Sequence, residues 1–150
     1  MRLLAHEAWA NHTLLKALEK ETSVAQRARN AFAHICAAPE LWMRRINGET
    51  IPLEAWWPIY DAEKLPEIIE KGAREWSKYL NALPDPVTEH MVEVISIKGE
   101  PITFRATDIL TQFHNHSCHH RGQIAVMFRS AGLEPIVTDF IVWARTVENG

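Results

Sequence analysis

The sequence predicts an all-α fold, a helical bundle that forms a single domain over residues 1–150. Four stretches carry apolar residues at helical spacing, and only one short stretch has the pattern of a β-hairpin. A chain of 150 residues has the usual size of one domain, and 47% hydrophobic with 23% charged residues is ordinary for a globular protein. Such a chain buries roughly two-thirds of its unfolded surface, so it needs neither disulfides nor a metal to hold its fold. We therefore expect any bound metal to serve function rather than stability.

Two amphipathic helices are predicted in the N-terminal third of the chain. Residues 3–20 and residues 24–46 each place apolar side chains on one side at a helical period. The apolar face of the first helix includes Asn11, whose amide is expected either to bond a neighbouring helix end or to reach the functional site. An Asn-Gly pair ends the second helix. Pro39 lies inside that helix, removes one helical hydrogen bond and predicts a kink just before it or a break into two helices.

The middle of the chain predicts a connection, a third helix and a hairpin. Residues 48–61 contain two prolines and a Trp-Trp pair without sustained periodicity, which indicates a loop that crosses between helices. Residues 62–83 return to helical spacing until Pro-Asp-Pro ends the helix. β-branched residues at 92–97, followed by Lys-Gly-Glu-Pro and residues 102–104, are typical of a short hairpin.

The C-terminal part predicts the last long helix and a short terminal one. Residues 105–130 form the long helix, and Gly132 ends it. Thr138 is the candidate N-cap of a terminal helix that runs through Val147. The small β element is therefore expected between the third and fourth long helices.

Composition and charge exclude several classes of function. The formal charge is −3 and no basic run is longer than Arg44-Arg45, which disfavours nucleic-acid binding. The sequence contains no window of about eighteen apolar residues, so no membrane-spanning helix is expected. The two cysteines form no CxxC pair and fit a reducing compartment, so a cytoplasmic location is expected.

The sequence FHNHSCHHRGQ in the last long helix carries four of the eight histidines. A helical wheel places His116 and His120 in the apolar stripe that also holds Phe113 and Ile124. His114 falls on the opposite side, His119 at the edge, and Cys118 points away from the stripe. Two inward histidines at i and i+4 can share one cation, although two core histidines satisfied by hydrogen bonds would show the same spacing.

A third inward histidine, His34, lies in the apolar stripe of the second helix. Burying several imidazoles without partners is costly, whereas a metal satisfies one nitrogen of each ring. Cys36 and Cys118 both point away from this site, so the predicted ligands are all nitrogen. Three imidazoles suit zinc or nickel better than iron or copper, and three protein ligands leave a position open to water or substrate.

The motif NHSCHHRGQI at residues 115–124 resembles the signature of the DinB-like (damage-inducible, YfiT-like) metalloenzyme family. The similarity extends to EAWANHTLL near the start, AHICAAPELWMRRINGE in the second helix, and Gly132, Pro135 and Asp139 near the end. It implies a four-helix bundle with a long crossover, and the family's metal ligands map onto His34, His116 and His120. Pro39 departs from the family's second helix and bears on the placement of His34.

The resemblance also implies an activity. Family members of known function resemble thiol-dependent transferases or isomerases, in which the metal binds the sulfur of a low-molecular-weight thiol such as bacillithiol or mycothiol. The resemblance also implies a homodimer. We therefore expect a metal-dependent detoxification enzyme with a small-molecule substrate. One alternative is a metal-assisted hydrolase, although no inward Glu or Asp stands beside these histidines. Another is a non-catalytic stress-response bundle. Such a bundle either binds a metal or small ligand, or keeps its histidines as inert core residues.

Further residues are candidates for supporting roles. His119 and Gln123 are expected either to contact the site or substrate or to make surface hydrogen bonds, and Trp42 is a candidate wall of the pocket. Asp139 is expected to accept from a ligand histidine or from Arg121, or only to favour a helix start. The remaining polar residues of interest have no motif support or are expected to be solvated: His6, His12, His90, Glu7 and Glu40.

Overall fold

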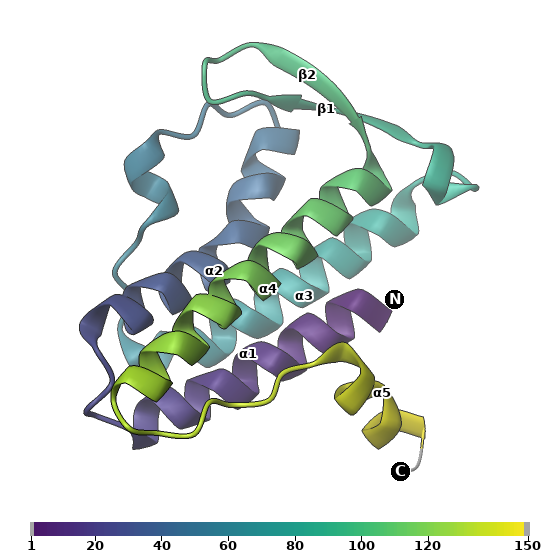
Figure 1. The fold of residues 1–150 in the computed structure, drawn as a ribbon. Coiled ribbons are helices and arrows are strands. Elements are labelled where there is room, and N and C mark those ends of the chain that lie inside the picture. The colour runs from purple at the N-terminus through teal and green to yellow at the C-terminus, as the bar shows by residue number, and fades with distance from the viewer. Residues whose placement is uncertain (1, 149–150) are drawn as a thin grey trace.

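The computed structural model describes residues 2–148 as an all-α fold with one small antiparallel hairpin, as the sequence predicts (Figure 1). Its helices are α1 (Arg2–Lys20), α2 (Gln26–Ile46), α3 (Leu65–Ala82), α4 (Ala106–Ser130) and α5 (Phe140–Glu148), and its strands are β1 (Met91–Ile95) and β2 (Pro101–Arg105). Short 3-10 turns lie at Leu53–Trp56, Ala62–Lys64 and Val87–Glu89. The predicted order of elements is confirmed, and most bounds agree to within two or three residues.

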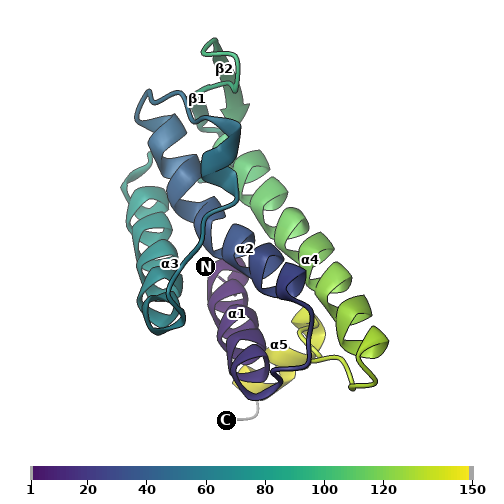
Figure 2. The same cartoon turned by 90° about the vertical axis from the view of Figure 1, so that its left-hand side faces the viewer.

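The four long helices pack so that α2 contacts α4 and α3, and α1 contacts α3. Apolar side chains from all four helices form one core cluster, which includes Phe32, Ile124 and Phe128. A second cluster around Trp76 and Phe113 continues toward the hairpin, which lies at one end of the bundle (Figures 1 and 2). The long connection between α2 and α3 runs along the outside of α2, as expected of a crossover.

Pro39 bends α2 without breaking it. The helix stays continuous from Gln26 to Ile46, and both views show its axis changing direction about half-way along (Figures 1 and 2). The Pro39 carbonyl accepts a hydrogen bond of 3.0 Å from Trp76 Nε1, and the ring packs so closely on α3 that a Cβ at Gly72 would lie 3.0 Å from Pro39 Cβ. Contacts with α3 therefore stabilise the bent helix, and the predicted kink occurs rather than the break.

The C-terminal helix begins later than predicted. Thr138 does not cap it, because α5 starts at Phe140 and the Asp139 carbonyl accepts from the backbone N–H groups of Val142 and Trp143. The Thr138 carbonyl instead accepts a hydrogen bond from His6 Nε2 at 2.9 Å. This bond ties the segment that leads to α5 onto α1. None of the helices built from residues 2–148 is long and apolar enough to cross a membrane.

Candidate metal centre

Three histidine rings from two helices meet on one side of α4. His34 comes from α2, and His116 and His120 lie one turn apart on α4. Their ring centroids are 4.5–4.8 Å apart, and the Nε2 atoms of His34 and His116 lie 2.7 Å apart. His34 is 5% exposed and His120 8%, while His116 is half-buried. One nitrogen of each ring lies within 4.8 Å of the others, so the three form a group that could hold a metal ion.

Hydrogen bonds orient two of the rings toward the third. His34 Nδ1 contacts the Trp56 carbonyl, which can only accept, so Nδ1 carries the proton and Nε2 keeps its lone pair, which faces His116 Nε2. His120 Nδ1 donates to the Gln123 amide oxygen at 2.8 Å, which leaves its Nε2 free in the same way. The Gln123 amide nitrogen in turn lies 2.9 Å from His119 Nε2. These partners select the tautomer that presents Nε2, the arrangement typical of metal-ligating histidines.

The surroundings of His116 and His120 favour the neutral form of these two rings. Burial, together with the nearby rings of His120, His34 and His119, lowers the pKa of His116 to about 4. Burial likewise lowers the pKa of His120. A neutral imidazole is the form that binds a metal, because protonation would occupy the lone pair. The donor set therefore fits a divalent cation that accepts nitrogen ligands.

Two tryptophans of the crossover loop cover the site. The Trp57 ring stacks on His34 with centroids 4.2 Å apart at an interplanar angle of 8°, and it meets His120 edge-on at 6.0 Å. Trp57 is nevertheless 54% exposed, so it forms the outer wall. Trp56 meets His34 edge-on at 6.4 Å and also supplies the carbonyl that orients it.

The three predicted histidines come together in the structure, but the sequence did not predict the tryptophan cover. Trp42, the predicted wall, contacts Trp56 edge-on at 6.5 Å and lies under the Arg45 guanidinium rather than against the histidines. The adjacent Trp56-Trp57 pair in a proline-containing loop was the available signal. The tryptophan pair does not show which element the loop packs against, because that depends on the tertiary structure.

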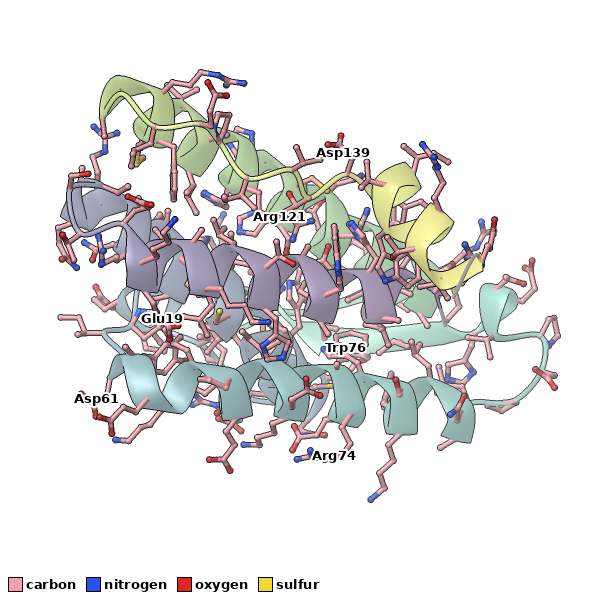
Figure 3. The ribbon with its side chains drawn as sticks, turned by 90° about the horizontal axis from the view of Figure 1, so that it is seen from below. Glu19, Asp61, Arg74, Trp76, Arg121 and Asp139 are labelled. Atoms are coloured by element: carbon pink, nitrogen blue, oxygen red, sulfur yellow. The ribbon has the colours of Figure 1, made fainter. Side chains whose placement is uncertain are left out.

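The opposite side of α4 holds a polar cluster that includes Glu7, for which the prediction from the sequence was wrong. Glu7, expected to be solvated, is 3% exposed and pairs with the Arg121 guanidinium through bonds of 2.9 and 3.0 Å. Arg121 also donates to Asn11 Oδ1 at 3.3 Å and to Cys118 Sγ at 3.2 Å. Arg121 does not bond Asp139; Figure 3 shows Arg121 on α4 beside α1, and Asp139 on the segment that leads to α5. Asn11 therefore bonds α4 and does not reach the three histidines.

His114 belongs to this second cluster. Its Nδ1 lies 2.7 Å from Glu7 Oε1, and its Nε2 lies 3.7 Å from Cys118 Sγ. The contacts with Cys118 and Glu7 raise the pKa of His114 to about 9, so this ring is positively charged at neutral pH. Glu7 lies one turn from both Leu4 and Asn11, so helical spacing alone could have placed it on the buried face.

The remaining predicted residues are placed as follows. Glu40 is exposed and faces Lys71, as expected of a solvated acid. His12 pairs with Glu70 on the surface. His6, which has no motif support in the sequence, is buried where α1 meets the segment before α5.

Comparison with protein families matches the chain to the DinB family over residues 2–149. The match covers nearly the whole chain and agrees with the resemblance drawn from the histidine motif. A comparison with curated proteins gives no match.

Proposed function

Because the chain belongs to the DinB family, we propose that it is a metal-dependent enzyme whose His34, His116 and His120 hold one divalent cation, zinc or nickel. The observation that carries the proposal is the meeting of three histidine nitrogens from α2 and α4, two of them freed for a metal by hydrogen bonds to the other ring nitrogen. Three protein ligands leave a coordination position for a small molecule.

We propose that this position takes the sulfur of a low-molecular-weight thiol. A bound divalent cation lowers the pKa of a thiol and makes it a ready nucleophile at neutral pH. The chain's own residues would orient and shield the reactants: the Trp56 carbonyl and the Gln123 amide hold two rings, and the Trp57 ring keeps water from one side. His119 supports Gln123 rather than contacting the metal, and Trp42 supports Trp56.

The surroundings of the site favour a thiol-dependent transferase over a metal-assisted hydrolase. A hydrolase needs a general base beside the reacting water. For residues 2–148, the ring and hydrogen-bond contacts of the three histidines involve one another, Trp56, Trp57, His119 and Gln123, and include no carboxylate. A nucleophile that loses its proton on binding the metal removes the need for such a base.

Elemental analysis of protein purified without a histidine tag tests the metal site. We expect about one zinc or nickel ion per chain, and its loss in His116→Ala and in His34→Ala. His90→Ala is the matched control, since this histidine lies between the 3-10 turn Val87–Glu89 and β1, away from the three ligands. Full metal content in both ligand variants would overturn the site.

Activity assays then separate an enzyme from a binder. Transfer of a small thiol to an electrophilic acceptor is expected with the metal-loaded protein and is expected to disappear after chelation. A protein that holds the metal but shows no such turnover with any small thiol tested would instead be the non-catalytic binding protein. Ester or amide hydrolysis lost on chelation would support the hydrolase.

We further propose that the enzyme works as a homodimer in the cytoplasm. The family resemblance supports the dimer, and the free cysteines Cys36 and Cys118 are in keeping with a reducing compartment. Sedimentation velocity at micromolar concentration tests the oligomeric state, and a single monomeric species there would contradict it.

A further inference from the structure

A second group of reactive side chains lies on the side of α4 away from the three histidines. Cys118 Sγ lies 3.7 Å from His114 Nε2, and His114 Nδ1 lies 2.7 Å from Glu7 Oε1. A nucleophile, a base and an acid paired with the base, in that order, are the parts of a nucleophilic relay. The contact between Glu7 and His114 is an ion pair rather than an aligned hydrogen bond. Arg121 adds a hydrogen bond of 3.2 Å to the same sulfur. The order of contacts resembles a catalytic triad, whereas a structural cysteine would be buried among apolar groups, as Cys36 is.

The sulfur faces space in which a small molecule fits. Cys118 is exposed, and it lines a cavity of about 360 Å³ between the C-terminal half of α4 and residues 135–140. Cavities of roughly 300–1,000 Å³ are typical of small-molecule sites. The relay therefore opens onto a space of the right size and not onto a flat surface.

The cavity wall carries polar groups that have no partner in the described part of the chain. His6 is 1% exposed, and because its Nε2 donates to the Thr138 carbonyl, its Nδ1 is a buried acceptor left without a hydrogen bond. Within residues 2–148, the charged ends of Arg129 and Asp139 also lack an ion-pair or hydrogen-bond partner. The charged ends of Arg129 and Asp139 are therefore the groups on this wall that a ligand could bind, whereas His6 Nδ1 has almost no accessible surface and lies deeper in the protein.

The charges on the wall indicate the kind of ligand. Arg121 is already paired with Glu7, which leaves one positive group, Arg129, and one negative group, Asp139, free to bind. A molecule with both a carboxylate and an ammonium group would satisfy both. Arg129 would hold the carboxylate and Asp139 the ammonium.

We propose that Cys118, His114 and Glu7 form a second reactive centre that exchanges its thiol with a small zwitterionic disulfide of the cystine type. Cys118 Sγ bonds to one sulfur of the disulfide, and the sulfur–sulfur bond of the small molecule breaks. The proton that Cys118 and His114 share stays on Nε2 during the attack and then passes to the departing sulfur, which leaves as a thiol. The protein thiol and the disulfide thus become a mixed disulfide and a free thiol, so no other oxidant is required.

The exchange rate of Cys118 tests this centre, measured by mass spectrometry on metal-loaded protein treated with cystine. Cys36 serves as an internal reference because it is buried in the core and is expected to stay unmodified. A second reference is Gln112→Cys in a Cys118→Ser background, which places an ordinary exposed thiol on the same helix. We expect Cys118 to react about tenfold or more faster than this reference thiol. Equal rates would overturn the proposal.

Two variants separate the relay from the cavity. His114→Gln is expected to reduce the rate of Cys118 to that of the reference thiol, and an unchanged rate would overturn the role of His114. The cavity is tested with cystine, the dication cystamine and the dianion dithiodiglycolate, each rate divided by that of the reference thiol. A preference for cystine that Arg129→Gln removes supports the zwitterion site, and equal ratios for the three probes would overturn it. Metal content is measured in parallel, so a failure here is distinguishable from a failure of the metal site.

Discussion

Glu7→Gln tests how much the buried ion pair between α1 and α4 contributes to stability. The side chains of Glu7 and Arg121 are both 4% exposed and share two hydrogen bonds, so the substitution leaves a buried guanidinium without its counter-charge. Breaking a buried pair in this way costs about 3–5 kcal/mol. With a urea dependence of about 2 kcal/mol per molar, the unfolding midpoint is expected to fall by roughly 2 M.

Urea titrations followed by tryptophan fluorescence at pH 7 measure this shift. Glu19→Gln is the matched control, because Glu19 lies exposed on the same helix (Figure 3) and its loss is expected to change stability by less than about 0.5 kcal/mol. A double variant, Glu7→Gln with Arg121→Met, is expected to recover part of the lost stability because the buried guanidinium that lacked its counter-charge is removed. A midpoint for Glu7→Gln that equals that of the control would refute the assigned contribution.

The same pair predicts how stability changes with acidity. Burial alone would raise the pKa of Glu7, but hydrogen bonds and positive charge from His114 and Arg121 lower it below its ordinary 4.5. A carboxyl whose pKa is lowered by folding stabilises the fold above its unfolded value, and that stabilisation is lost as the pH falls through the folded value. The difference between wild type and Glu7→Gln is therefore expected to be complete above about pH 4.5 and to shrink below it. A difference that stays constant down to pH 3 would contradict this cause.

Three further predictions concern the histidines, the helix packing and the tryptophan cover. Since folding lowers the pKa of His116 to about 4, the metal-free protein is expected to melt at a lower temperature at pH 5 than at pH 7. This drop in melting temperature is expected to be smaller in His116→Gln, and equal drops in calorimetry would contradict the prediction. Gly72→Ala places a Cβ 3.0 Å from Pro39 Cβ and is expected to cost about 1–3 kcal/mol of stability. Gly122→Ala meets nothing within 4 Å and is expected to stabilise the fold by about 0.5–1 kcal/mol. Equal melting temperatures for the two variants would show that α2 and α3 are not tightly packed at Gly72. Trp57→Ala removes the ring stacked on His34 and is expected to speed metal release to a chelator by about two- to tenfold in stopped-flow measurements, and unchanged release would mean that this ring does not cover the metal.

Helix periodicity predicted the elements well because each helix buries one stripe. The hairpin followed from its β-branched pattern and turn residues, and β1 and β2 pair over residues 91–95 and 101–105, close to the predicted 92–97 and 102–104. The start of α2 and the cap of α5 were less accurate. α2 begins after Ala25 without a side-chain cap, and Thr138 uses its carbonyl to bind His6 instead of starting a helix. Such bounds depend on neighbouring elements as well as on local preference.

Charged residues were harder to place than apolar ones. Glu7 was expected in solvent because an acid is rarely buried unless it is paired, and its partner lies 114 positions away. Arg121 directly follows a predicted metal ligand, and Asp139 was one partner predicted for it. Only the packing of α1 against α4 decided that Glu7 takes that place.

The sequence by itself determined the side of α4 on which each histidine lies. A helix turns once every 3.6 residues, so His116 and His120 share a face and His114 and Cys118 face elsewhere, whatever the rest of the chain does. Only the tertiary structure decided what these faces meet: His34 and Trp57 on one side, Glu7 and the cavity wall on the other. The physical reason is that spacing within a helix is set by local backbone geometry, whereas contacts between distant segments depend on how the whole core packs.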